Sequence, residues 1–558
     1  MTMNPRTLFC FFAVTGLMAQ SWPKTVVEST NYERTSTVAE VRSYMDALIK
    51  SAPSLREYLP KNAPKTTETG KAILAWRIPA TGKNPVRVYI NANIHAGEVE
   101  GKEAVQLLAR EILQGKHPAI RQNIDLVICP AYNADGTDAL DPANRIHQPN
   151  PKSGVGPREN VFGLDLNRDM MKAVTANTRW MLAMYRDFDP DCTIDLHSTN
   201  GSRHGFHVTH SPAHGTGGDS SLTAFNRRML IEIRESLKTK GLPTYDYGNF
   251  RLNSDRQPIM WETDSLGQNM VSNYPILENR LGVLVETLVY RSYEDRVQDN
   301  VKFILETLGW VARNTSEIQR ERKQAQDRWL SDCAKGSPLL PLGAKLVETE
   351  SYTFEAFEFA RDGQGRPLRD EKGRYIGEKN IKQLTLPSFV TFEWTDYVTA
   401  PVGYLVDRAY ADRIRPILEA HGVSVMPGTQ RPKGEALLYF HETDRKISAG
   451  AYQGVFTLSL SGVWMPELPS IRAAYSWKPD DLDNAIYVPI NQPMGRVAFY
   501  LLDPRAPDGL IFWGFFNSSF IRGPGMWGEG PRCPVLAVGI AASGTPVEAN
   551  SKVGNVEE

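Results

Sequence analysis

The tetrapeptide His95-Ala96-Gly97-Glu98 places an imidazole and a carboxylate three residues apart, directly after an apolar run. Such nitrogen and oxygen ligands suit Zn²⁺ better than Ca²⁺ or Mg²⁺, which prefer oxygen alone. About half a match to this spacing is expected by chance in a chain with ten histidines. The alternative interpretation is a turn histidine beside a solvent-exposed glutamate, so the pattern needs partners elsewhere in the sequence.

A further ligand is expected at His197, which closes the apolar, β-branched run 191–197. A hydrolytic metal site needs three protein ligands and one open position for water. His95 and His197 both stand at the carboxyl end of a predicted strand, the edge where ligands collect in open α/β sheets. The sequence therefore predicts one zinc ion held by His95, Glu98 and His197. A buried strand histidine without a ligand is the alternative for His197.

Glu286 ends a third mostly apolar run, residues 280–286, and should emerge at the same edge of the sheet. Burial raises the pKa of a carboxylate and a nearby cation lowers it. A glutamate balanced between these effects can take a proton from water and return it to a leaving amine. We therefore expect Glu286 to be a general acid/base. The alternative is a structural ion pair with Arg280 or Arg291.

Asn167 and Arg168 lie in the connection between the two histidine-bearing strands. Arginine offers a planar fork that matches a carboxylate with two parallel hydrogen bonds, and the asparagine amide adds a donor. We expect this pair to hold a substrate carboxylate. Arg145 and Arg158 are further cations in the same connection, and either can face the oxyanion of a reaction intermediate.

The motifs and their order resemble those of the M14 family of zinc carboxypeptidases, which are carboxypeptidase A-like. The resemblance covers roughly residues 30–320. The residues that carry it are His95 and Glu98 in H-x-x-E, Asp165 to Arg168 in D-x-N-R, His197 and Glu286. It implies that His95, Glu98 and His197 bind zinc and that Glu286 is the general acid/base. It also implies that Asn167 and Arg168 hold the terminal carboxylate of a peptide.

Two positions depart from the family pattern. Gln148 stands where an arginine that polarises the scissile carbonyl is expected, so Arg158 is the preferred substitute and Arg145 the second choice. Tyr274 is matched to the family's mobile tyrosine and is expected at the substrate, but it lies closer to Glu286 than that tyrosine does in the digestive enzymes. Asp169 after the Asn-Arg pair, together with the H-A-G-E tetrapeptide, resembles secreted bacterial members more than digestive enzymes.

The first 21 residues read as a signal peptide, with a positive charge followed by a short apolar segment. Its apolar part is too short to cross a bilayer. The chain has 63 basic and 64 acidic side chains, so its charge does not favour nucleic acid as a partner. We expect an exported protein, periplasmic or extracellular, without a stable membrane anchor.

Strand and helix patterns alternate over residues 28–330, which predicts an α/β catalytic domain with a mixed central sheet flanked by helices. Residues 336–558 are predicted to form a β-rich second domain of unknown role, with a small α/β element at 401–426. A single long helix is expected over 297–328, and the apolar run 509–516 is expected to be a strand.

Half of the chain's histidines lie within eighteen residues, namely His197, His204, His207, His210 and His214. A second metal ion is one interpretation of this cluster. Strand alternation over 205–210, however, places His207 and His210 on opposite faces. We therefore expect one zinc ion, with the other histidines supporting its ligands or facing the substrate.

These residues together predict hydrolysis of an amide bond next to a substrate carboxylate by water that zinc activates. The substrate partner is then a peptide or another amide. An amidase or deacylase of small or cell-wall-derived molecules would use the same zinc and Glu286 without needing Arg168 as a clamp. A binding protein with a purely recognition-type zinc site is a third possibility, and it would have no use for a buried base.

Overall fold

A computed structural model describes residues 22–145, 151–199, 202–255, 257–264, 266–336, 338–360, 362–364, 366, 368, 377–466, 477–516 and 534–539. The predicted signal peptide and Gln148 lie outside these residues. None of the described helices is both long and apolar enough to cross a membrane.

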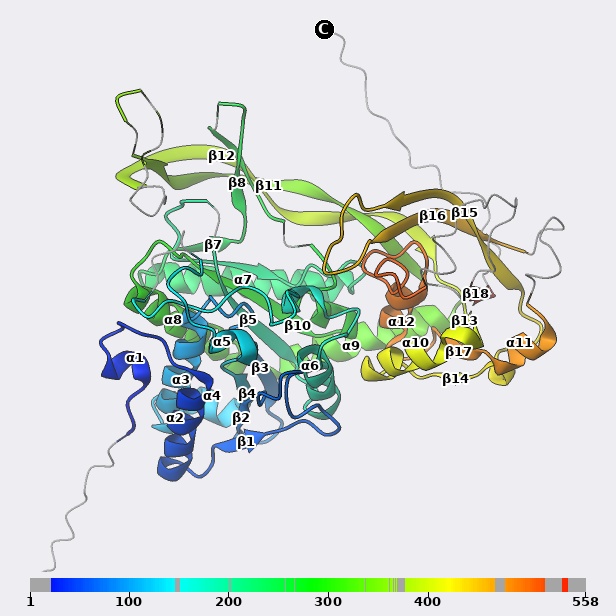
Figure 1. Ribbon diagram of the computed structural model, residues 1–558, viewed down its shortest axis with the longest axis horizontal. Helices are drawn as coiled ribbons and strands as arrows, with labels where there is room; N and C mark the ends of the chain where they lie inside the picture. The colour runs from blue at the N-terminus through cyan, green and yellow to red at the C-terminus, as the bar shows by residue number, and fades with distance from the viewer. Residues whose placement is uncertain are drawn as a thin grey trace, which may run out of the picture.

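An eight-stranded mixed sheet lies at the centre of the N-terminal half, with the order β1-β2-β4-β3-β5-β10-β6-β7 (Figure 1). Its neighbouring strands β4, β3, β5 and β10 are parallel. Such strands are buried on both faces, which explains their nearly continuous apolar sequences. The predicted α/β class is confirmed. The strands are β1 (Arg56–Tyr58), β2 (Ala75–Ile78), β3 (Val86–Ala92), β4 (Ile124–Cys129), β5 (Cys192–Ser198), β6 (Val208–Pro212), β7 (Thr244–Asp246) and β10 (Leu281–Thr287).

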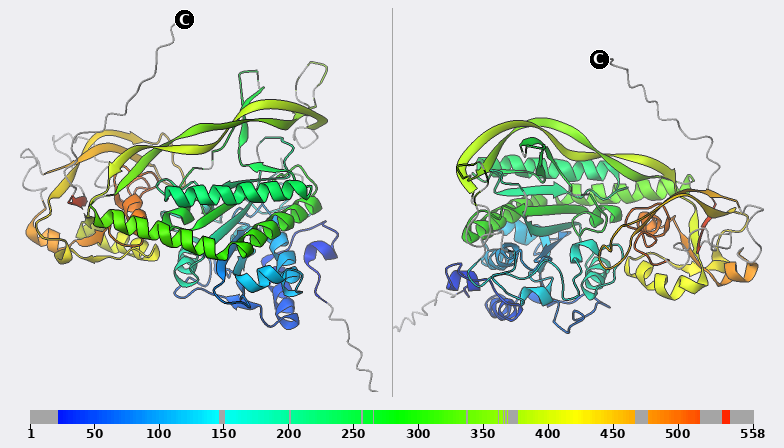
Figure 2. Two further views of the ribbon diagram at one scale, coloured as in Figure 1. Left: turned by 180° about the vertical axis from the view of Figure 1, so that it is seen from behind. Right: turned by 45° about the horizontal axis from the view of Figure 1, so that its top comes forward.

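Helices cover one face of this sheet, and in the rear view of Figure 2 α7 lies along α8 and α9, which follow one another end to end. Val88 and Ile90 of β3 pack into this layer. The helices that contribute to it are α2 (Val38–Ser51), α3 (Glu100–Leu113), α4 (Pro118–Asn123), α7 (Ser220–Thr239), α8 (Tyr293–Arg313) and α9 (Thr315–Ala334). Short helices elsewhere are α1 (Val26–Ser29), α5 (Ala134–Thr137), η1 (Leu166–Arg168) and η2 (Tyr274–Glu278).

The opposite face, to which Tyr89 of β3 points, packs on α6 (Ala176–Asp187) and on the C-terminal half of the chain. One continuous core cluster joins Tyr89 and Trp180 with Tyr404 and Phe499. After α9 in the sequence, most of the helical residues in this cluster belong to α10 (Arg408–Ala420) and α12 (Gly495–Leu502). The two halves of the chain therefore share a core, and the predicted domain division between residues 330 and 336 stays a prediction.

Two further sheets make the C-terminal region β-rich, as predicted, with orders β11-β12-β9-β8 and β14-β17-β13-β18-β15-β16. The long β11–β12 hairpin extends across the top of the central layers in Figure 1. The elements are β8 (Asn249–Leu252), β9 (Pro258–Glu262), β11 (Leu339–Phe359), β12 (Gly377–Thr399), β13 (Gly403–Val406), β14 (Met426–Pro427), η3 (Gly428–Gln430), β15 (Leu437–Ile447), β16 (Leu458–Met465), α11 (Pro479–Asn484), β17 (Ile486–Pro489) and β18 (Val535–Val538).

Two predicted elements differ in the structure. The expected helix over 297–328 is two helices that meet at Asn314, whose backbone (φ −116°, ψ 24°) is not helical. The Asn314 side-chain amide donates to the Trp310 carbonyl (2.8 Å) and so ends α8. The predicted strand 509–516 consists of bends and turns, and its apolar side chains, Trp513 among them, are buried in the shared core instead of pairing in a sheet.

Candidate active site

The carboxyl ends of β3, β5 and β10 meet at one edge of the central sheet. Glu286 of β10 stands opposite His197 of β5 in the parallel register, and His95 follows β3 by three residues. The sheet order therefore explains why side chains from three distant segments meet in one place.

A tight turn after β3 presents His95 and Glu98 on the same side. Asn93, with a positive φ of 61°, donates its side-chain amide to the carbonyl groups of His95, Ala96 and Glu98 (3.0–3.2 Å). A side chain at Gly97 would place its Cβ 2.6 Å from the Gly156 carbonyl oxygen. Glycine is therefore needed at the centre of the tetrapeptide for close packing, and Asn93 fixes the shape of the turn.

Three ligand atoms converge on one point. The Nδ1 atoms of His95 and His197 are 3.2 Å apart, and each lies 2.9 Å from a carboxylate oxygen of Glu98. Tetrahedral zinc with bonds of about 2.0–2.1 Å holds neighbouring ligand atoms about 3.3 Å apart. The three side chains are buried, and among the described residues they are the one group with metal-ligand spacing. The donor set and its geometry fit one zinc ion.

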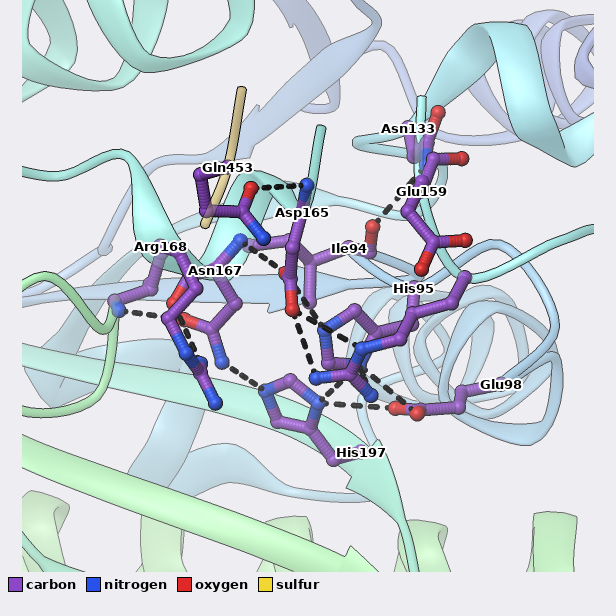
Figure 3. Close-up of polar contacts among 12 residues, drawn as sticks. Ile94, His95, Glu98, Asn133, Glu159, Asp165, Asn167, Arg168, His197 and Gln453 are labelled. Atoms are coloured by element: carbon purple, nitrogen blue, oxygen red, sulfur yellow. Dashed lines mark hydrogen bonds and ion pairs between the residues drawn. The ribbon is translucent and has the colours of Figure 1, made fainter. Parts of the chain in front are cut away.

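Carboxylates support both imidazoles from behind, as Figure 3 shows for His95. His95 Nε2 lies 3.1 Å from Asp165 Oδ1, and His197 Nε2 lies 2.7 Å from Asp195 Oδ2. A carboxylate that accepts the second ring N–H fixes the tautomer and orientation of a metal-binding histidine. Both Nδ1 atoms are thus left facing the metal position.

The charges around the ligands favour a cation between them. Burial lowers the pKa of His197, but the Asp195 and Glu98 carboxylates outweigh burial and raise that pKa well above its usual value. Burial raises the pKa of Glu98, but the cations of His95 and Arg145 and the hydrogen bond from His197 hold it well below its usual range. A metal ion would replace the proton that His197 otherwise carries.

Glu286 lines a cavity of about 290 Å³ next to the ligands. Burial is the main cause that raises the pKa of Glu286 to about 8, with the Glu98 carboxylate adding to it and the charge of His197 opposing it. A bound dication beside it would lower this value. The cavity is lined by His95, Glu98, Arg158, Asn167, Arg168, His197, Ser198, Tyr247, Asp264, Met270, Ser272, Leu284 and Glu286.

The structure separates the two candidate arginines. Arg158 lines the cavity, with its guanidinium 3.4 Å from His95 Nδ1 and 2.9 Å from the Asp165 carboxylate. Arg145 is not among the lining residues and forms a 2.9 Å ion pair with Glu98. Arg158 therefore faces the cavity, whereas Arg145 lies behind the metal-ligand candidate Glu98.

Asn167 and Arg168 both line the cavity from η1. Asn167 is held by its neighbours, because its side-chain oxygen accepts from the Val271 N–H (2.8 Å) and its own N–H donates to Asp165 Oδ1 (2.8 Å). Arg168 donates from one terminal nitrogen to the Asn167 carbonyl (2.8 Å). Two side chains with hydrogen-bond donors therefore line the same cavity as Glu286.

Tyr274 does not lie at the cavity, where the resemblance to the family placed it. It is fully buried in η2, where its hydroxyl contacts Glu278 and His421 (2.7 Å each), and it does not line the cavity. The tyrosine that does line it is Tyr247, which hydrogen-bonds to Asp264, another lining residue. Both residues lie in loops beside short strands, where no periodic pattern marks them. The sequence signal available was a tyrosine and an acid within 40 residues before Glu286.

The other histidines of the predicted cluster lie away from the cavity. His204 packs on Trp261, His210 on Phe303 and His214 on Phe392, with ring centroids 5.2–5.6 Å apart. His204, His207, His210 and His214 are all absent from the lining residues. His207 instead makes polar contacts with Arg291 (3.1 Å) and Asp299 (3.5 Å). The expectation that these histidines face the substrate finds no support in their positions.

The buried His210 predicts acid sensitivity. Burial lowers its pKa to about 3, whereas histidine in an unfolded chain titrates near 6.5. Below pH 6.5 the unfolded state binds a proton at this histidine and the folded state does not. The free energy of unfolding therefore decreases by about 1.4 kcal/mol for each unit by which the pH is lowered. Urea unfolding at pH 7.5 and pH 5.0 should show this loss. His210→Leu should lose about 2 kcal/mol less than the unmodified protein over the interval from 6.5 to 5.0. The two proteins differ only at residue 210, so an equal loss in the two would contradict the prediction.

Comparison with known proteins agrees with the motifs. Residues 41–203 match the sequence model of the zinc carboxypeptidase family, peptidase M14, and this segment contains the three ligands, Asn167 and Arg168. Glu286 lies beyond the matched segment. The resemblance stated from the motifs is confirmed over residues 41–203.

Solved structures similar to this chain include three metallo-carboxypeptidases. The enzyme from Pseudomonas aeruginosa, in complex with (2-guanidinoethylmercapto)succinic acid, is 15% identical, covers 51% of this chain and 70% of its own, and has a TM-score of 0.38. The Burkholderia cenocepacia enzyme is 14% identical, with 50% and 69% covered and a TM-score of 0.37. Carboxypeptidase A from Helicoverpa armigera is 15% identical, with 51% and 74% covered and a TM-score of 0.36. No curated protein sequence matched.

Proposed function

We propose that this chain, whose residues 41–203 are those of a zinc carboxypeptidase, hydrolyses the amide bond next to the free carboxylate of a peptide. One observation carries the proposal: a single cavity of about 290 Å³ holds the zinc ligands, a buried glutamate and a paired amide and guanidinium. Each of these groups matches one requirement of the reaction.

His95, Glu98 and His197 would hold the zinc ion, with Asp165 and Asp195 orienting the two imidazoles. Bound zinc supplies Lewis-acid chemistry, activating water and polarising the carbonyl oxygen. Because the ligands are buried and already face one another, little rearrangement is needed for the ion to bind.

Glu286 would accept the proton of the attacking water on its carboxylate and deliver it to the nitrogen of the departing amine. Arg158 would donate hydrogen bonds to the oxyanion that develops on the carbonyl, a contribution typically worth about 3 kcal/mol. Asn167 and Arg168 would bind the substrate carboxylate and so restrict cleavage to the neighbouring bond. A cavity with both a proton acceptor and a carboxylate clamp favours a carboxypeptidase over a binding protein.

We expect the protein to shorten a mixed peptide pool from the carboxyl end. Product masses should show stepwise loss of C-terminal residues, and a zinc chelator should abolish that loss because three ligands without the ion leave no Lewis acid. Re-addition of Zn²⁺ should restore it.

Peptides blocked as C-terminal amides are the matched control and should survive intact. Absence of trimming by protein that retains stoichiometric zinc would instead support an amidase or deacylase of small or cell-wall-derived molecules. Export to the periplasm or the medium stays a prediction from the N-terminal sequence.

A further inference from the structure

A turn from the C-terminal half of the chain reaches the candidate active site. It belongs to the connection between β15 and β16, residues 448–457, called here the 448–457 loop. At its tip Gln453 accepts a hydrogen bond from the Asp165 N–H (2.8 Å), as Figure 3 shows. Asp165 is the carboxylate that contacts both His95 and Arg158. The 448–457 loop, almost 300 residues later in the sequence, thus contacts the residue that connects His95 with Arg158.

The tip has an unusual conformation for its residue type. Tyr452 and Val455 exchange two backbone hydrogen bonds (2.8 and 3.1 Å), closing a two-residue turn around Gln453 and Gly454. Both central residues have positive φ, 49° and 79°, as a type I′ turn requires. Glycine, asparagine and aspartate are the residues that favour such positions, whereas glutamine is disfavoured there. A disfavoured conformation at a functional cavity points to a role for the side chain itself.

Tyr452, the residue before the tip, holds Arg168. Its hydroxyl accepts a hydrogen bond from Arg168 Nε (3.0 Å), and its ring stacks on the buried Trp513 with centroids 5.7 Å apart and an angle of 23°. Lys172 completes the arrangement: its Nζ lies 4.7 Å from the centre of the Trp513 ring and donates to the Arg168 carbonyl (2.6 Å). The side chain and the main chain of Arg168 are therefore both tied to the same aromatic pair.

These contacts fix the plane of the Arg168 guanidinium. Nε is directed to Tyr452 and one terminal nitrogen to the Asn167 carbonyl, so two sides of the fork are already oriented before a substrate arrives. A guanidinium oriented in advance loses less freedom when it binds a carboxylate, and this strengthens binding. The partially exposed Tyr452 would thus act on the substrate through Arg168.

We propose that the 448–457 loop is a substrate-positioning element in which Tyr452 orients Arg168 and Gln453 orients Asp165. The affinity for the substrate carboxylate then depends on a region outside the segment that matches the family. The inference rests on the proposed function, because it takes Arg168 to be the carboxylate clamp. Tyr452 and Gln453 are positioning residues and take no part in proton transfer.

The test uses Tyr452→Phe, which removes the hydroxyl and keeps the stacked ring. Tyr397→Phe, at an exposed tyrosine of β12, is the matched control. Calorimetry on the zinc-loaded full chain measures binding of a dipeptide analogue with a reduced, uncleavable amide bond, once with a free C-terminal carboxylate and once as the C-terminal amide. Tyr452→Phe should weaken binding of the carboxylate form about fivefold, since one hydrogen bond to a charged group is lost. Binding of the amide form should not change.

Equal carboxylate affinity in Tyr452→Phe and the unmodified protein would overturn the inference, as would an equal loss for both forms of the analogue. Failure of the proposed function is a different result, because the unmodified protein itself would then bind the carboxylate and amide forms alike. Gln453→Gly supplies an independent arm. Glycine accepts the positive φ, so thermal stability should be kept, while kcat/KM for a carboxylate substrate falls because Asp165 is held less firmly beside His95 and Arg158. A parallel loss of stability and activity would show a purely structural role.

Discussion

Replacement of Glu286 by glutamine is expected to lower kcat by about 10²–10⁴-fold while zinc stays bound. Glutamine has the same size and can still form hydrogen bonds in the cavity, but it cannot accept the proton of the attacking water. Substrate affinity should survive, because the proposed carboxylate clamp, Asn167 and Arg168, is held by contacts that do not involve Glu286. Steady-state kinetics on a peptide with a free carboxyl terminus, together with metal analysis, measures both quantities.

Glu235→Gln is the control for this change, since Glu235 is an exposed glutamate of α7 with a single ion pair to Arg234. It should retain full activity. Retention of most of the activity by Glu286→Gln would show that another group accepts the proton. Continued binding without hydrolysis would separate an enzyme from a protein that only recognises its ligand.

Removal of an imidazole ligand in His197→Ala should abolish stoichiometric zinc binding. Removal of a hydrogen-bond partner behind a ligand typically lowers metal affinity by about 10–100-fold. The loss of zinc affinity in His197→Ala should be larger, because one of three protein ligands disappears. Asp195 and Glu98 would also lose their shared partner: Glu98 would keep its ion pair with Arg145, whereas the buried Asp195 carboxylate would lose its contact with the His197 imidazole. Metal analysis after dialysis and peptide-trimming activity should both fall to background.

His210→Leu is the matched histidine control, because His210 is equally buried and contacts no metal ligand in the described residues. It should keep one zinc ion per chain. Full zinc occupancy in His197→Ala would contradict the proposed ligand set, because zinc would then be held without His197.

The central part of the site could be predicted from the sequence because apolar runs report buried strands. His95, His197 and Glu286 each follow such a run, and parallel neighbours in a sheet end at the same edge. The adjacency of β3, β5 and β10, which brings these residues together, is seen only in the structure. Burial and strand ends therefore account for the success at the metal position.

The walls of the cavity could not be predicted in the same way. Tyr247 and Asp264 lie in loops whose positions depend on tertiary packing. Tyr274 was expected at the substrate only because it resembles the family's mobile tyrosine. Tyr452 and Gln453 lie in the C-terminal half, and no local pattern connects them to Arg168 or Asp165. The break at Asn314 could not be predicted, because asparagine occurs inside helices often enough that it gives no clear stop signal.

The core shared by the two halves has a consequence for the history of this chain. Tyr89 and Trp180 on the catalytic side are buried against residues such as Tyr404 and Phe499. An ancestor that ended after α9 would have exposed these aromatic side chains to water, at about 1.5–3 kcal/mol for each large apolar group. The C-terminal half is therefore needed to keep these side chains out of water, and a change of volume on one side of the shared core calls for a matching change on the other.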